Sequence, residues 1–227
     1  MNDHWVFVVM PAAAVALALC GGLVRYVLWR RQPAASRVRA GDRGSGGVTV
    51  IWRLAIAIVL IGHFLAFAFP ETVSLWNRQH DRLVLLEATG LLAGGIALAA
   101  WLVVVVQRAR ARRGARSSID VVAGTLIAIE IISGLAIAIL YRWASSWSGV
   151  TLVPYLHSLL QMKPAVELVA DMPFLVRLHV VCAFALLAVA PYTDMVRPVF
   201  VSLDRVAGWI FAPVAALWRP TWLTRRG

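Results

Sequence analysis

The sequence predicts an all-α integral membrane protein built as a bundle of five transmembrane helices. Hydrophobic residues make up 61% of the 227 residues, more than a soluble domain of this size could cover with polar surface. The mean hydropathy is +0.78, and the apolar residues gather into long runs. A hydrocarbon core of about 30 Å is crossed by about 20 helical residues, so each long run predicts one span.

Five runs have the required length and composition. They extend approximately from Trp5 to Leu28, Val50 to Phe69, Leu83 to Val106, Ile119 to Tyr141 and Pro173 to Tyr192. The first run is too long for the apolar part of a removable signal peptide, so we expect it to remain as a helix. The connection from Tyr141 to Met172 is expected to be the longest one on its side of the membrane.

The C-terminal region differs from the five spans. The apolar stretch from Val199 to Leu217 is interrupted by Asp204 and Pro213 and by other polar and helix-breaking residues, which favours an amphipathic cytoplasmic tail over residues 193–227. No internal repeat or separate soluble domain is visible. The sequence therefore predicts a single membrane domain over residues 1–227.

The distribution of arginine predicts the orientation. All of the 22 basic residues except Lys163 are arginines, and they gather after the first span, between the third and fourth spans, and in the tail. The positive-inside rule then places the N-terminus outside and the C-terminus in the cytoplasm. The arginines lie between apolar runs and not on a water-exposed face, which excludes nucleic acid as a partner and leaves the lipid bilayer as the expected environment.

Two of the five histidines, His63 and His179, are expected within spans, where an ionisable side chain is costly and usually functional. The second span runs outward to Pro70 and the fifth runs inward from Pro173. At 1.5 Å per residue, His63 lies about 10 Å and His179 about 9 Å below the outer boundary. Two antiparallel helices therefore bring a histidine to the same depth.

Histidines at matching depth are the arrangement that bis-histidine ligation of a haem requires. Gly62, beside His63, and Gly94 on the third span, with its neighbours Gly90 and Gly95, offer small surfaces that a porphyrin could approach. An alternative interpretation is that both histidines form only hydrogen bonds within the bundle and that the glycines only pack helices. Depth alone leaves both interpretations open.

Several short motifs resemble the gamma subunit of respiratory nitrate reductases. They are Ile61-Gly62-His63-Phe64, Ala93-Gly94-Gly95, the run from Val176 to Val181 around His179, and the arginine-rich third connection. The resemblance covers nearly the whole chain. It implies a cytochrome b that takes electrons from quinol and passes them to an iron-sulfur subunit, with His63 and His179 as the axial iron ligands of the outer haem. It also points to a pairing of Arg177 with a haem propionate, and the alternative is that Arg177 extends outward to the membrane interface.

The sequence departs from the family pattern at the second, inner haem. The resemblance places the two ligands of that haem at the positions of Arg53 and Arg197, and a guanidinium offers no lone pair to iron. We therefore expect a single haem b. Two hypotheses remain for the arginines: they bind an anionic group at the inner site, or they extend to the cytoplasmic interface as ordinary interfacial arginines.

Three acidic or basic side chains are candidates for proton chemistry. Quinol oxidation needs a hydrogen-bond donor to the ring oxygen and a proton acceptor, for which Glu87 and His80 near the outer end of the third span are candidates. The alternative is that both are solvated boundary charges. Glu130, in the middle of the fourth span, is expected either to bond a histidine ring or to take part in proton movement.

The sequence thus predicts a membrane cytochrome b subunit of a quinone-linked respiratory oxidoreductase, in the bacterial inner (cytoplasmic) membrane. Its expected cofactor is one haem b, with quinone or quinol as substrate, and its expected partner is an iron-sulfur or other redox subunit. The alternative is a haem-free scaffold or transporter that retains the same fold. A stand-alone enzyme has little support, because the sequence shows no nucleophile–base pair, phosphate-binding loop or metalloprotease motif.

Overall fold

The computed structural model describes residues 3–32, 46–110, 117–193 and 200–204. Within these ranges the secondary structure is helical, without strands. Five helices are long and apolar enough to cross a membrane, namely Trp5–Arg30, Gly47–Ala68, His80–Gln107, Ser118–Leu140 and Phe174–Tyr192. The predicted all-α fold with five spans is therefore confirmed, whereas the orientation of the termini stays a prediction. Most of the predicted tail lies outside the described residues.

The spans are formed by seven elements. The π-helical turn η1 (Trp5–Val9) continues into α1 (Met10–Arg30), and the second to fourth spans are α3 (Gly47–Ala68), α5 (His80–Arg110) and α6 (Ser118–Leu140). The fifth is α10 (Phe174–Val189), which ends in the 3₁₀ turn η2 (Ala190–Tyr192). The third span begins at His80, before its apolar run, because the hydrogen-bonded backbone continues and Asp81 suits the positive end of the helix dipole.

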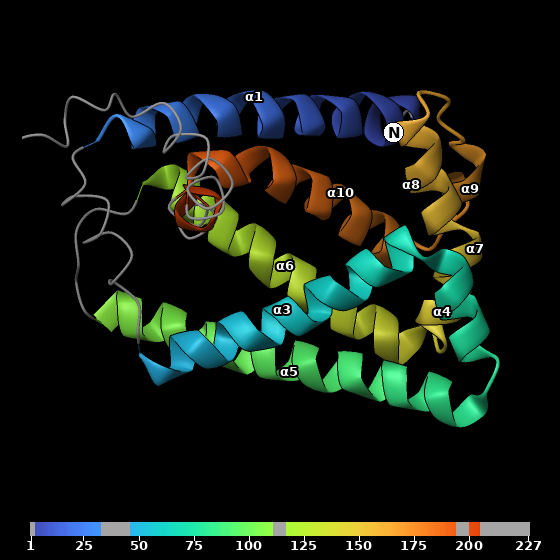
Figure 1. The fold of residues 1–227 in the computed structure, drawn as a ribbon. Coiled ribbons are helices and arrows are strands. Elements are labelled where there is room, and N and C mark those ends of the chain that lie inside the picture. Colours follow the sequence, from blue (N-terminus) through green and yellow to red (C-terminus); the bar gives the residue numbers. More distant parts are fainter. Residues whose placement is uncertain (1–2, 33–45, 111–116, 194–199, 205–227) are drawn as a thin grey trace, which may run out of the picture.

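Four short helices lie together at one end of the bundle, which we call the capped end (Figure 1). They are α4 (Pro70–Asn77), α7 (Ala144–Val150), α8 (Leu152–Leu160) and α9 (Glu167–Ala170). Pro70 stands in the first turn of α4, where its missing N–H leaves no backbone bond unmade. The long connection between the fourth and fifth spans is thus largely helical, which its short apolar runs did not indicate.

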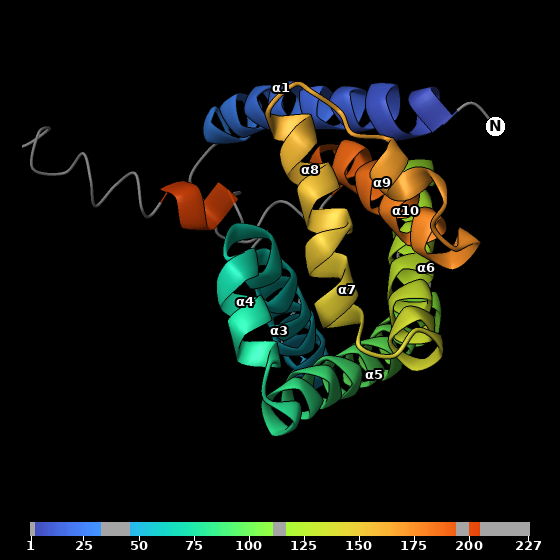
Figure 2. The same cartoon turned by 90° about the vertical axis from the view of Figure 1, so that its right-hand side faces the viewer.

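The spans pack in the order α1, α10, α6, α5, α3. Figure 2, viewed toward the capped end, shows these helices around the short α7 and α8. Ala55, Ala97, Ile127 and Ile131 form a buried cluster that joins α3, α5 and α6. Small alanine side chains let these backbones approach closely, which is how helices associate when lipid provides no hydrophobic driving force.

A second buried cluster closes the capped end. Phe7, Tyr155 and Val169 are almost completely buried and bring η1, α8 and α9 together. The hydroxyl of Tyr155 donates a hydrogen bond of 2.8 Å to the carbonyl oxygen of Phe7, and the two rings meet edge to face. Burial raises the pKa of the Tyr155 phenol above its ordinary value. The start of the first span is therefore held by a connection more than a hundred residues later in the chain.

Candidate functional site

His63 lies in the last two turns of α3, toward the capped end. Its Nδ1 is 2.8 Å from the carbonyl oxygen of Val59 in the preceding turn. A carbonyl oxygen only accepts, so Nδ1 carries the proton and Nε2 keeps its lone pair. The side chain is exposed in the chain by itself, although it stands within a membrane span. An imidazole in this position is costly unless its lone pair is used.

His179 lies in the second turn of α10 and is held by two residues of α6. Its Nδ1 is 2.9 Å from Oγ of Ser133 and 3.1 Å from Oε2 of Glu130. The Ser133 hydroxyl also lies 3.2 Å from the backbone carbonyl oxygen of Glu130. Both contacts of the ring with α6 are made at Nδ1, and Nε2 has no hydrogen-bond partner among the described residues.

The rings of His63 and His179 lie close to each other. Their centroids are 6.3 Å apart, and their planes are inclined by 36°. The two helices that carry these rings pack mainly against other helices. The α3 helix packs on α5, and α10 packs on α6 and α1. The structure thus brings together the two histidines that the sequence places at one depth.

Gly134 gives the His179 ring its space. A Cβ atom at this position would lie 3.2 Å from Cε1 of His179, tighter than an ordinary contact. Glu130, Ser133 and Gly134 are three and four residues apart, so they share one face of α6 and together hold one side of the ring. From the sequence, contact of Glu130 with a histidine ring was one of two possibilities, and Ser133 and Gly134 were not predicted. Their spacing from Glu130 is the signal that could have found them.

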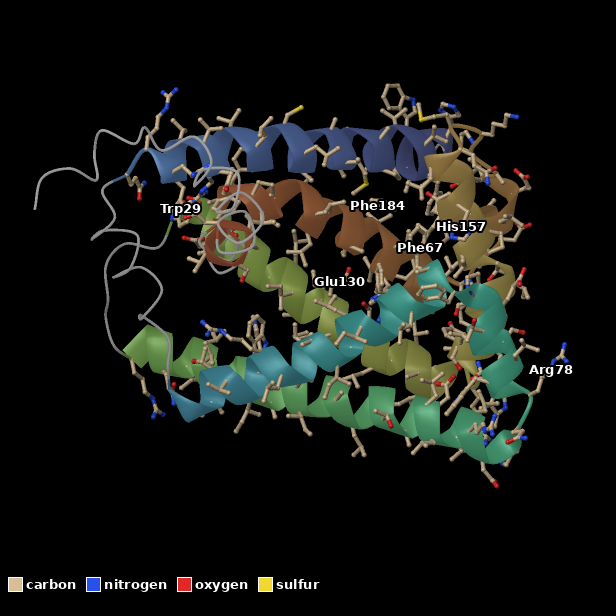
Figure 3. All side chains as sticks on the ribbon, viewed as in Figure 1. Trp29, Phe67, Arg78, Glu130, His157 and Phe184 are labelled. Carbon is tan, nitrogen blue, oxygen red and sulfur yellow. The ribbon has the colours of Figure 1, made fainter. Side chains whose placement is uncertain are left out.

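Glu130 itself lies in the middle of the bundle, as Figure 3 shows. Its side chain is 15% exposed, and that of His179 is 22% exposed. One carboxylate oxygen contacts the ring, while Oε1 is buried and has no hydrogen-bond partner among the residues that the structure describes. A carboxyl group in a membrane span is costly, and this contact is the interaction that the structure gives it.

Arg177 is engaged away from the histidine pair. Its guanidinium forms an ion pair with Asp3 and donates to the carbonyl oxygen of Ala170 at 3.2 Å. It also lies over the ring of Phe7, 5.2 Å from the centroid. The structure therefore shows Arg177 fastening the N-terminal end of the first span to the start of α10. Its predicted pairing with a propionate stays a prediction.

The two quinone candidates lie at the capped end. Oε1 of Glu87 accepts hydrogen bonds from the backbone N–H and the hydroxyl of Ser145, at 2.9 and 2.5 Å, and so caps the first turn of α7. The ring of His80 packs against Trp143, with centroids 5.7 Å apart. Both residues contact the same short segment, Trp143 to Ser145. Their role in proton transfer stays a prediction.

The remaining predicted positions differ in their surroundings. A Cβ at Gly62 would meet nothing within 4 Å, so the surface beside His63 is open, and the role of Gly62 at a haem stays a prediction. A Cβ at Gly94 would lie 2.9 Å from Leu135, so this glycine packs α5 against α6. Arg53 is exposed on α3. Arg197 lies outside the described residues.

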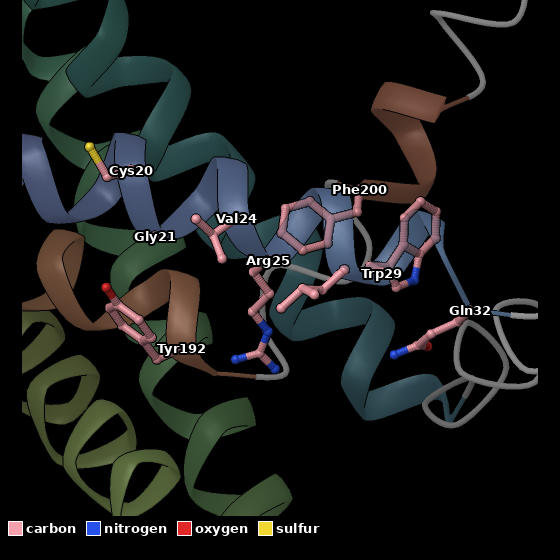
Figure 4. A pocket seen from close by; sticks show the side chains of 9 residues that line it. Cys20, Gly21, Val24, Arg25, Trp29, Gln32, Tyr192 and Phe200 are labelled. Carbon is pink, nitrogen blue, oxygen red and sulfur yellow. The ribbon is translucent and has the colours of Figure 1, made fainter.

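A cavity of about 530 Å³ lies at the end of the bundle opposite the capped end (Figure 4). It is lined mainly by α1, including Cys20 and Arg25, and by Tyr192 and Phe200. Gly21 lets the Tyr192 ring lie against α1, because a Cβ there would be 2.6 Å from the phenol oxygen. The cavity shares no lining residue with the histidine pair.

Among the described residues, no group of three or more histidine, cysteine, aspartate or glutamate side chains could hold a metal ion. A metal centre built only from protein ligands therefore has no basis in this part of the chain. A haem supplies four of its iron ligands itself and needs only two from the protein, so a histidine pair is the relevant feature.

Fold and site together define a multi-pass helical membrane protein in which histidine rings from two different spans lie with their centroids 6.3 Å apart. The family model for the nitrate reductase gamma subunit matches residues 3–226, and the chain belongs to this family. Members of the family are membrane cytochrome b subunits that act in electron transfer within a membrane nitrate reductase complex. The resemblance inferred from the sequence is thereby confirmed. No curated protein matches the chain.

Proposed function

We propose that the chain is a membrane cytochrome b subunit that exchanges electrons between quinone and a partner redox subunit through one haem b, with His63 and His179 as axial ligands. One observation carries the proposal. Two imidazoles on different spans lie with their ring centroids 6.3 Å apart, and each contacts the protein through Nδ1, while its Nε2 has no hydrogen-bond partner among the described residues.

The spacing of the rings fits this role. A metal ion bonded to one nitrogen of each ring at about 2 Å would separate the centroids by about 6 Å, once about 1 Å from centroid to nitrogen is added on each side. The centroids are 6.3 Å apart. Ordinary aromatic pairs also pack at about 4.5–7 Å, so the distance alone fits a haem-free scaffold as well. The bonds at Nδ1 favour the haem, because metal-bound histidines typically donate their other N–H to a carbonyl or carboxylate.

The side chains around the histidine pair would orient the two rings and surround the haem. His63 and His179 would bind the haem, and its iron would supply reversible one-electron chemistry. Val59, Ser133 and Glu130 hold the two rings, and Gly62 leaves open surface beside one of them. The apolar residues exposed on α3, among them Ile58 and Phe64, suit a lipid or protein environment that excludes water. Arg53, at one of the positions that would carry an inner-haem ligand, supports a single haem.

The proposed function also includes a partner subunit, a membrane location and a quinone site. The expected partner is an iron-sulfur or other redox subunit, and the expected location is the bacterial inner membrane with the capped end outside. Glu87 and His80 are proposed for proton exchange with quinone at the capped end, where both contact the start of α7. Their participation requires that Glu87 release Ser145 or share it with the substrate.

The test is spectroscopic. The full-length chain is purified in detergent, and reduced-minus-oxidised spectra and the haem content per chain are measured. We expect one haem b per chain, and we expect His63→Ala and His179→Ala to lose it. His157→Ala is the matched control, because this histidine lies at the same end of the bundle and bonds the carbonyl oxygen of Phe67.

Each outcome decides a part of the proposal. Two haems per chain would contradict the single-haem assignment. Absence of haem from the wild-type chain would favour the haem-free scaffold or transporter, and retention of haem in both ligand variants would contradict the assignment of His63 and His179 as its ligands. Loss of haem from the His157 variant as well would show that the depletion is a general folding effect and not loss of a ligand.

A further inference from the structure

Asn77, the last residue of α4, carries a polar atom that the described residues leave without a partner. Its side-chain Nδ2 donates to the hydroxyl oxygens of Ser145 and Ser146, at 3.2 and 3.4 Å. Its Oδ1 is buried and has no hydrogen-bond partner in the part of the chain that the structure describes. A buried acceptor in this state costs free energy comparable with a lost hydrogen bond, so its presence calls for an explanation.

Asn77 and Glu87 hold the same residue of α7. Oε1 of Glu87 accepts from the backbone N–H and the hydroxyl of Ser145, and that hydroxyl in turn accepts from Nδ2 of Asn77. The α7 helix packs against both α4 and α5, which carry these two side chains (Figure 2). Because one serine joins them, a movement of Ser145 away from Glu87 also frees the amide of Asn77. The displacement that proton exchange at Glu87 requires therefore opens both side chains to the same ligand.

The segment that carries Ser145 is held by contacts between side chains. Trp143, two residues earlier, packs edge to face on His80, and the guanidinium of Arg142 lies 5.1 Å from the centroid of its indole ring. The backbone of Trp143 has a φ of 63°, a conformation that a residue other than glycine adopts only at a cost. A movement of the start of α7 is therefore partly offset by the relief of this strain.

The acceptor at Asn77 distinguishes the two redox forms of a quinone. An amide oxygen only accepts hydrogen bonds. A quinol has two hydroxyl groups that donate, whereas a quinone has two carbonyl oxygens that only accept. Oδ1 of Asn77 can therefore bond a quinol but stays unpaired beside a quinone, and a site built to bond a hydroxyl group discriminates against the analogue that lacks it.

We propose that Asn77 is a substrate-binding residue of the quinone site, and that its Oδ1 accepts a hydroxyl of the quinol, so that the site binds the reduced form in preference to the oxidised form. This inference rests on the proposed function, in which Glu87 exchanges a proton with the same molecule. Asn77 takes up no proton and changes no charge, because it selects by the direction of one hydrogen bond. The selection favours entry of quinol and release of quinone.

The experiment uses the full-length haem-loaded chain in detergent, with decylubiquinol as the electron donor and decylubiquinone as the competing product. The rate of haem reduction gives the half-saturating concentration of quinol, and its inhibition by quinone gives an inhibition constant. Asn77→Leu keeps the approximate size of the side chain and removes Oδ1. We expect the half-saturating concentration of quinol to rise about 3- to 10-fold, as for the loss of one hydrogen bond, while the inhibition constant of quinone and the haem content stay unchanged.

Two further variants accompany Asn77→Leu. Gln79→Leu is the matched control, because it removes the same amide group from an exposed position two residues later, and it should change neither constant. Asn77→Ala also removes Oδ1 and should show the same separation of the two constants. An effect that appears only in the leucine variant would be an effect of its side-chain packing and would overturn the inference.

The remaining outcomes separate the inference from the proposed function. An equal rise in both constants, or a rise in neither, overturns the inference and leaves the proposed quinone site standing. Loss of haem from both Asn77 variants would make Asn77 a structural residue and would also overturn the inference. A wild-type haem that neither decylubiquinol nor menadiol reduces would overturn the proposed quinone site together with this inference.

Discussion

Replacing Gly134 by alanine would test whether the close fit of α6 around His179 is needed for haem binding. The added Cβ would lie 3.2 Å from Cε1 of the ring. Carbon atoms in contact prefer about 3.5–4.0 Å, so the ring must retreat by a few tenths of an ångström or α6 must move. His179 is also held at Nδ1 by Ser133 and Glu130 of the same helix, which limits how the ring can adjust.

The expected magnitude follows from the cost of overpacking. An extra methyl group in a well-packed interior typically costs about 1–3 kcal/mol. Since 1.4 kcal/mol corresponds to a tenfold change in an equilibrium constant, haem binding should weaken by about 5- to 150-fold if the whole cost falls on the ligand. Alanine also favours the helix over glycine by about 1 kcal/mol, so the fold itself should not be lost.

Gly124→Ala provides a matched control. Gly124 is on the same helix, and a Cβ there would meet nothing within 4 Å, so this variant gains the same helix propensity without the contact. The assay is the haem content of each purified full-length chain, followed by the rate at which haem is transferred to an excess of apomyoglobin. Equal haem content and equal transfer rates in the two variants would refute the reasoning.

Three further predictions concern the capped end. Tyr155→Phe should lower the free energy of unfolding by about 1 kcal/mol, because the hydrogen bond to Phe7 is lost, and thermal unfolding in detergent measures this. The pKa of the Tyr155 phenol is raised in the folded state, so the stabilising contribution of Tyr155 is present below the unfolded pKa of about 10 and falls as the pH rises above it. The free energy of unfolding of Tyr155→Phe should therefore fall less than that of the wild type between about pH 9 and pH 11. An equal fall in both proteins would contradict this. Asp3→Asn should cost about 0.2–1 kcal/mol, because its ion pair with Arg177 is partly exposed, and the loss should shrink in high salt; a larger, salt-independent loss would argue against a screened ion pair.

Much of the fold was accessible from the sequence because a membrane imposes strong and simple constraints. A span must be long, apolar and helical, so the five runs could be located within a few residues of the observed helices. The fixed rise of an α-helix then placed His63 and His179 at one depth. It also placed Glu130 mid-span, where the contact with a histidine ring could be anticipated as one of two possibilities.

The partners within the bundle could not be obtained in this way. Depth does not say which helices are neighbours, and only the tertiary structure shows that α10 packs on α6, which brings Ser133 and Gly134 to His179. No helix was predicted in the connection between the fourth and fifth spans, because its apolar runs are too short to stand out. Its helices form because they pack on η1, a contact between distant parts of the chain.

For Arg177, too, the position in the chain could be read from the sequence, whereas the contacts of the side chain could not. Its position two residues before His179 was visible in the sequence, but the direction of a long flexible side chain depends on charges that other segments bring near it. The structure gives it Asp3, from the opposite end of the chain. The sequence by itself thus determined the spans and the depth of the ionisable groups, because both follow from local helix geometry and the energy of burial in lipid. Only the tertiary structure decided which side chains meet, because contacts between helices depend on packing and rotamers that no local pattern specifies.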